Sequence, residues 1–160
     1  MEKVILKSSY IILKEKQLVI DIYDGILTLE NFKGHKLKQA TEKDFSPNYN
    51  LLSDFTTVEV RMSLQDLQEY ASFIKAQGNI VGKRKAAVVT NTPNQLVYAT
   101  AYDKYIKNDV GQDLITFPTF EDAFEWLGLQ DSKEEILALI AKFRQNPLFK
   151  WTIKENSSYY

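Results

Sequence analysis

Short apolar runs alternate with amphipathic helical patterns in this sequence, and a helix-start residue follows the apolar run three times. Three such units are present: residues 50–55 before Ser63, residues 85–90 before Thr92, and residues 114–117 before Thr119. Ser and Thr side chains accept a hydrogen bond from the first turn of a helix, which is why they mark its start. Strands that alternate with amphipathic helices predict an α/β fold, with a mostly parallel sheet and helices packed on it.

The N-terminal part predicts two antiparallel strands. Residues 10–13 and 17–23 are rich in β-branched and aromatic side chains, and only the polar segment 14–16 separates them. So short a connection favours a hairpin. Asp24–Gly25 is predicted to end the second strand, because Asp and Gly are turn residues. Residues 4–6 are a candidate for a further edge strand.

The C-terminal part predicts a helix followed by a strand. A helix that begins near Asp131 would bury one apolar face, and Pro147 would end it. Residues 149–154 alternate apolar and polar side chains, as in a strand with one buried face. That strand either covers its own sheet or exchanges with a second subunit, so a homodimer stays open. The four residues expected on the buried helix face are Ile136, Leu139, Ile140 and Phe143.

We expect a single domain over residues 1–160, with a core over 8–130 and the C-terminal helix and tail strand over 131–160. The chain has 20 Lys and Arg against 21 Asp and Glu. Because a nucleic-acid surface needs a basic excess, this balance does not favour one. No stretch reaches the roughly 20 apolar residues of a membrane span, and the N-terminal apolar run is too short for a signal peptide. A cytoplasmic protein is expected.

The sequence contains no Cys and one His. This composition excludes disulfides, thiol nucleophiles and zinc sites with Cys ligands, so neither a metal nor another cofactor is predicted. His35 is expected to be exposed on the polar side of its helix. The basic run over residues 82–85 is expected to be a solvated turn, because its charges are few and isolated.

Three segments resemble the SpoIIAA-like proteins, a family of small bacterial proteins related to the anti-sigma-factor antagonists and STAS domains. They are residues 24–28, residues 50–55 and the Phe-x-x-Phe-x-x-Ala-x-x-Trp-Leu pattern over residues 117–127. The resemblance covers roughly residues 10–129. It implies a (βα) superhelix with an N-terminal antiparallel hairpin, and a binding or regulatory module rather than an enzyme.

The phosphorylated turn of the antagonists is not retained. In that family an Asp-Ser-Ser-Gly turn at a helix start receives the phosphate, and here the turn falls on Met62-Ser63-Leu64-Gln65. Three of the four residues differ. Ser63 is therefore interpreted as a helix cap, although a helix start would also favour a phosphate on this serine.

The carboxyl ends of the predicted parallel strands carry polar residues. Binding sites of open α/β sheets lie at this edge, and hydroxyls, amides and helix starts can hold an anion or a small polar ligand. The same residue types are ordinary caps and turn formers. Asp54 could serve as a general base, but no His or second carboxylate is near it in sequence to tune its pKa. The candidate ligand-binding residues are Asp54, Thr56, Thr57, Thr90, Asn91, Thr92 and Asn94.

The third predicted helix has an apolar arc that is wider than a surface helix needs. Its centre is formed by Tyr98, Tyr102 and Tyr105, whose apolar rings and polar tips suit a half-wet contact. Either neighbouring elements cover this arc, or it contacts a second subunit, a protein partner or a ligand. Trp151 of the tail strand poses the same question.

The sequence therefore predicts a non-catalytic binding or regulatory module for an unknown protein partner or small ligand. One alternative is a protein that binds a lipid-like or anionic small molecule. Another is an enzyme that uses the strand-end crevice around Asp54.

Overall fold

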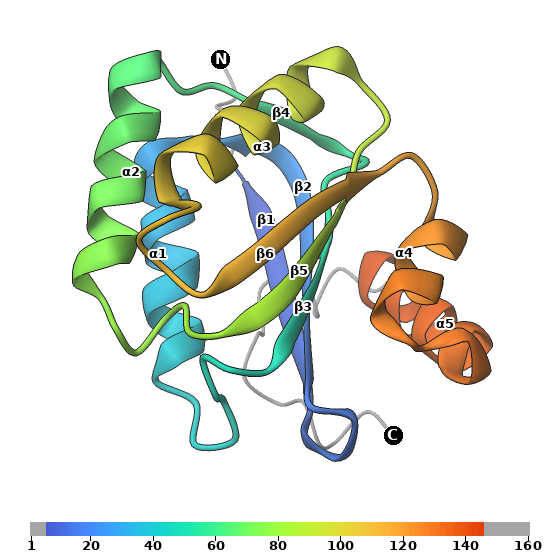
Figure 1. The fold of residues 1–160 in the computed structure, drawn as a ribbon. Helices are drawn as coiled ribbons and strands as arrows, with labels where there is room; N and C mark the ends of the chain where they lie inside the picture. The colour runs from blue at the N-terminus through green and yellow to red at the C-terminus, as the bar shows by residue number, and fades with distance from the viewer. Residues whose placement is uncertain (1–5, 146–160) are drawn as a thin grey trace.

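The computed structural model describes residues 6–145, so the predictions for residues 4–5, Pro147, Trp151 and the tail strand fall outside the described residues. A six-stranded sheet lies between two groups of helices (Figure 1). Its strands are β1 (Lys7–Leu13), β2 (Leu18–Leu27), β3 (Asn50–Asp54), β4 (Val58–Val60), β5 (Arg84–Val89) and β6 (Gln112–Phe117). The helices are α1 (Leu29–Ala40), α2 (Leu64–Ala76), α3 (Pro93–Ile106), α4 (Phe120–Leu127) and α5 (Lys133–Gln145).

The predicted α/β architecture is confirmed. The strands follow the order β1-β2-β3-β5-β6; β1 and β2 form the antiparallel hairpin, and the other neighbours are parallel. The predicted end of the second strand is wrong, because β2 continues through Asp24 and Gly25 to Leu27. Gly25 adopts a φ of 108°, which a glycine tolerates and which lets the strand pass this point.

The extension of β2 has a partner that the sequence does not signal. After β3 ends, the chain turns through Phe55 and Thr57 and pairs again with β2 as β4, opposite Gly25–Leu27. Between Asp54 and Val58 the chain advances by four residues, while its partner advances by three, from Ile22 to Gly25. The extra residue is taken up by a turn, which the hydrogen bond from the N–H of Val58 to the carbonyl of Phe55 closes.

The three predicted helix starts are confirmed. The hydroxyl oxygens of Ser63, Thr92 and Thr119 each accept a hydrogen bond from the third residue of the following helix. In α2 and α3 the side chain of that third residue also accepts from the backbone N–H of the cap, which completes a capping box.

Each face of the sheet has its own apolar core. Helices α4 and α5 cover one face, where the expected residues of α5 are buried. Helices α1, α2 and α3 lie on the opposite side (Figure 1). Alternate residues of a strand point to opposite faces, so in β5 Ala87 and Val89 pack toward α4 and α5, while Arg84 and Val88 point toward α3.

Candidate functional site

A cavity lies between the sheet and helices α1, α2 and α3. Its volume is ≈ 50 Å³, measured as the space open to the centre of a water-sized sphere, and one side of it is open to solvent. Most of its walls are aliphatic and aromatic, with a few polar side chains among them. The lining residues are Leu27, Phe32, Lys36, Leu51, Ser53, Phe55, Val60, Met62, Leu67, Tyr70, Val81, Arg84, Val88, Tyr98, Ala99, Tyr102, Gln112 and Leu114.

Small side chains on facing elements leave this space open. Ser53 of β3 and Ala99 of α3 both line the cavity, and both are buried. Protein interiors are normally packed to the density of organic crystals, with few voids larger than a water molecule. On the other face of the sheet, Leu52 and Val89 belong to the same buried apolar cluster as Phe124 of α4.

Beneath the cavity, four side chains donate to one buried carboxylate. Asp21 Oδ1 accepts from His35 Nε2 at 3.0 Å and from Gln39 Nε2 at 2.6 Å. Asp21 Oδ2 accepts from Lys36 Nζ at 2.5 Å and from the Tyr23 hydroxyl at 3.1 Å. Burial opposes ionisation of Asp21, but the Lys36 cation and the imidazole of His35 outweigh it and hold the pKa of this carboxyl well below its usual range.

The prediction that His35 is exposed is wrong, because only 4% of the residue is accessible. The side chains of His35, Lys36 and Gln39 lie on the face of α1 that packs against β2. There the Asp21 carboxylate accepts their hydrogen bonds and compensates the cost of burying them. Burial lowers the pKa of His35, although the Asp21 carboxylate acts in the opposite direction. The imidazole is therefore neutral at physiological pH, and Nε2 carries the proton that Asp21 accepts.

The neutral state of His35 predicts a pH dependence of stability. In the unfolded chain the imidazole takes up a proton at about pH 6.5, whereas in the folded protein it does so only at lower pH. The unfolded state thus binds more protons, and stability falls as the pH drops below about 6.5. Urea unfolding of the wild type and of His35→Gln between about pH 7 and about pH 5 checks this. In the wild type, His35 is expected to add up to about 1.4 kcal/mol per pH unit to the change of the free energy of unfolding with pH, and His35→Gln is expected to lack this contribution. Equal pH dependence of stability in the two proteins would contradict the assignment.

Arg84 enters the cavity from the start of β5. The prediction that residues 82–85 form a solvated turn is wrong at this residue, which is 6% exposed. Its Nε donates to Gln112 Oε1 at 2.7 Å, while its buried Nη1 has no hydrogen-bond partner among the described residues. A signal for burial exists in the sequence, since Arg84 has the same strand parity as the apolar Ala86 and Val88.

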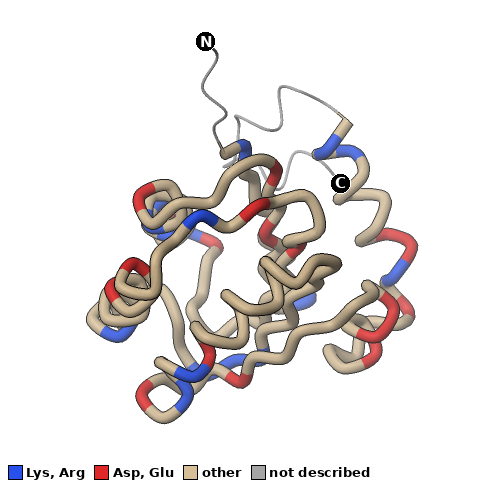
Figure 2. The backbone as a smooth tube through the Cα atoms, turned by 90° about the horizontal axis from the view of Figure 1, so that it is seen from above, with Lys and Arg blue, Asp and Glu red and all other residues tan. Residues whose placement is uncertain are grey.

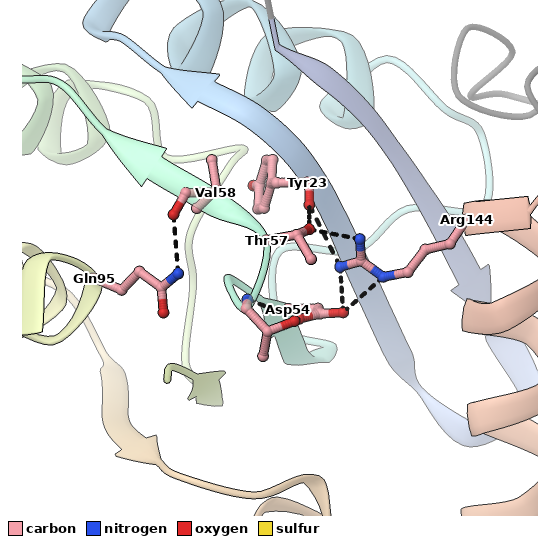
Figure 3. Close-up of polar contacts among 7 residues, drawn as sticks. Tyr23, Asp54, Thr57, Val58, Gln95 and Arg144 are labelled. Atoms are coloured by element: carbon pink, nitrogen blue, oxygen red, sulfur yellow. Dashed lines mark hydrogen bonds and ion pairs between the residues drawn. The ribbon is translucent and has the colours of Figure 1, made fainter. Parts of the chain in front are cut away.

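The predicted strand-end residues fall into two groups, of which Asp54, Thr56 and Thr57 form the first. Asp54 is 1% exposed; its Oδ1 accepts from the backbone N–H and the hydroxyl of Thr56, and its Oδ2 from Arg144 of α5. Arg144 Nη1 also donates to the hydroxyl oxygen of Thr57 at 2.6 Å, and Thr57 in turn donates to the carbonyl of Tyr23 (Figure 3). Arg144 thus fastens α5 to β2 and to the end of β3.

The second group surrounds the start of α3. Asn94 accepts from the N–H of Val60 and donates to its carbonyl, so it holds β4. Thr92 caps the helix, and Asn91 donates its backbone N–H to Gln95 Oε1. Gln95 Nε2 donates to the carbonyl of Val58 (Figure 3). Thr90 is buried, and its N–H donates to the carbonyl of Phe117. None of the seven candidates lines the cavity, and their role in ligand binding stays a prediction.

Two of the three candidate tyrosines of α3 do line it. The rings of Tyr98 and Tyr102 face the cavity, and Tyr102 contacts Tyr70 of α2 at a centroid distance of 5.3 Å. Tyr105 lies beside α2, where its hydroxyl oxygen accepts from Gln68 Nε2 at 3.1 Å. All three are half-buried. Ser63 is exposed and caps α2, and its phosphorylation stays a prediction.

Basic and acidic residues are interspersed along the described backbone, over its helices and loops (Figure 2). Within residues 6–145, no group of three or more acidic or His side chains is placed to hold a metal ion. The same residues include no helix long and apolar enough to cross a bilayer.

Comparison with known proteins identifies the fold. No family model and no curated protein matches the sequence. The chain is similar to the crystal structure of an uncharacterised protein of the DUF3478 family from Shewanella loihica PV-4, which is described as having a SpoIIAA-like fold. The TM-score is 0.51 at 16% sequence identity, over 79% of this chain and 98% of the other. The predicted SpoIIAA-like fold is thereby confirmed, and at this identity the likeness extends to the fold alone.

Proposed function

We propose that this protein is a non-catalytic binding module that takes up an apolar small molecule in the cavity between the sheet and helices α1, α2 and α3. The observation that carries the proposal is the cavity itself, which has a volume of ≈ 50 Å³ and mainly apolar walls. Ligand sites in proteins are typically concave and mostly apolar, with a small number of polar groups that orient the ligand. Tyr98 and Tyr102, already candidates for a ligand surface from the sequence, belong to its wall.

The buried carboxylates of Asp21 and Asp54 already accept hydrogen bonds within the protein, which supports a binding role over a catalytic one. A general base needs a lone pair that can face the reacting group. Asp21 already accepts from four side chains, and Asp54 accepts from Thr56 and Arg144. An enzyme centred on Asp54 would have to break its ion pair with Arg144 first, so we favour the binding module.

Filling the cavity is expected to weaken ligand uptake without unfolding the protein. The side chain added by Ala99→Leu on α3 would occupy unfilled space, and we expect it to weaken binding of an uncharged apolar probe at least about tenfold. Titration of the fluorescence of Nile red, and calorimetry with dodecanol, measure this binding. A wild-type protein that binds neither probe would overturn the proposal.

Val97→Leu provides the matched control, because Val97 lies two residues away on the same helix but is 61% exposed. This variant is expected to bind both probes as the wild type does, with circular dichroism confirming that both variants are folded. Equal probe binding by Ala99→Leu and Val97→Leu would place the probe elsewhere on the protein and contradict the assignment of the cavity.

A further inference from the structure

The cavity contains a charged group that the protein itself leaves incompletely bonded. Arg84 is more than nine-tenths buried, and the neutral side chain of Gln112 is the partner of its Nε. Its Nη1 is shielded from solvent and has no acceptor within residues 6–145. Buried guanidinium groups are normally paired, because a charge removed from water without a counter-charge is costly.

The charges around the cavity do not balance. Lys36 and Arg84 both line it, and the Lys36 ammonium is neutralised by Asp21 at 2.5 Å. His35 is neutral, and no ion pair joins Arg84 to a carboxylate in the described part of the chain. One carboxylate therefore faces two cations, which leaves one positive charge in excess beside an apolar space.

We propose that the ligand is an apolar carboxylic acid whose carboxylate accepts a hydrogen bond from Arg84 Nη1 while its hydrocarbon part fills the cavity. This inference rests on the proposed function and adds the chemical class of the ligand. The carboxylate would supply both the missing acceptor and the missing negative charge. Aliphatic and aromatic walls formed by residues such as Phe32, Met62 and Leu67 would cover the rest of the molecule.

The number of available donors favours a carboxylate over a phosphate. A phosphate monoester carries a charge of about −1.5 to −2 at neutral pH and three strong acceptor oxygens. Here the excess charge is one, and the Lys36 ammonium is already held by Asp21. A monoanion with an apolar body matches this arrangement in charge and in polarity.

The test compares acids with alcohols of equal chain length. Decanoic and dodecanoic acid, decanol and dodecanol, and dodecyl phosphate are titrated into wild type, Arg84→Met and Arg61→Met by calorimetry. Met keeps an unbranched, flexible stem and removes the charged guanidinium group. Arg61 is a suitable control because it is exposed and does not line the cavity.

The wild type and Arg61→Met are expected to bind each acid about ten- to a hundredfold more tightly than the matched alcohol. Arg84→Met is expected to lose this preference and to keep alcohol binding.

The outcomes separate the two proposals. If wild type binds neither acids nor alcohols, the cavity does not take apolar ligands and the proposed function fails. If it binds both equally, or if Arg84→Met keeps the preference for acids, the cavity is a ligand site but the carboxylate inference is overturned. Tighter binding of dodecyl phosphate than of dodecanoic acid also overturns it.

If Arg84→Met does not fold, NMR of nitrogen-labelled wild type replaces the variant. The guanidinium signals of Arg84 are expected to shift when dodecanoic acid is added and to stay unchanged when dodecanol is added. Unchanged signals in the presence of the acid would overturn the inference.

Discussion

Replacement of Asp21 by Asn is expected to lower the free energy of unfolding by about 3–5 kcal/mol at neutral pH, the largest effect of any conservative substitution discussed here. The variant would leave the Lys36 ammonium buried without a counter-charge. It would also put an amide N–H₂ in place of one carboxylate oxygen, where it would face two donors. These are His35 and Gln39 at the position of Oδ1, or Lys36 and Tyr23 at that of Oδ2. Urea denaturation of the wild type and the variant measures the difference.

Asp44→Asn is the matched control, because Asp44 pairs with Lys14 at 3.9 Å on the surface. Such pairs contribute about 0–1 kcal/mol, and the control is expected to stay within that range. Lys36→Met added to Asp21→Asn is expected to restore part of the stability, since it removes the unpaired charge. A loss below about 1 kcal/mol for Asp21→Asn would contradict the assignment.

Acid provides a second check on Asp21. Because the pKa of this carboxyl is held well below its usual range, its contribution to stability is fully present above about pH 4 and is lost as the pH falls further. The difference between the wild type and Asp21→Asn is therefore expected to narrow below about pH 4. A difference that stays constant down to the acid transition would show that Asp21 acts without its charge.

The second large effect is expected for Arg144→Met, which removes the contact between α5 and the strand ends. The Asp54 carboxylate would keep only its bonds from Thr56, and Thr57 would lose a charged donor. Loss of one partner of a buried ion pair costs about 3–5 kcal/mol. Because the side chain of Arg144 is 22% exposed, we expect a smaller loss of about 2–3 kcal/mol, again measured by urea denaturation.

Arg61→Met again serves as the control, since Arg61 pairs with Glu59 on the surface and is expected to change stability by less than about 1 kcal/mol. Binding of apolar probes to Arg144→Met is expected to equal that of the wild type, because Arg144 does not line the cavity. Unchanged stability of Arg144→Met would mean that this ion pair does not fasten α5 to the sheet.

The helix starts were predictable because their causes are local. Ser63, Thr92 and Thr119 each bond to a backbone group three residues away, so the pattern that predicts the cap also contains its partner. The hairpin and the strand–helix order follow in the same way from periodicity and short connections. These local signals are sufficient for the architecture.

The cavity and the Asp21 cluster were not predicted, because their partners are brought together only by packing. His35 meets Asp21 fourteen residues away, and the rotation of α1 that produces the contact is set by the sheet beneath it. The strand β4 is missed for the same reason, since it exists through its pairing with the end of β2. One signal was present: Asp21 interrupts an apolar strand, and a buried carboxylate requires partners from elsewhere in the fold.

The two faces of the sheet differ in how completely they are filled. Between β2, β5 and helices α4 and α5 the interior is apolar and continuous, whereas the opposite face keeps space around Ser53 and Ala99. Substitutions at those small residues would change the shape of the cavity, while the packed face would continue to stabilise the fold. Ligand specificity on such a scaffold can therefore change without loss of the core that stabilises the fold.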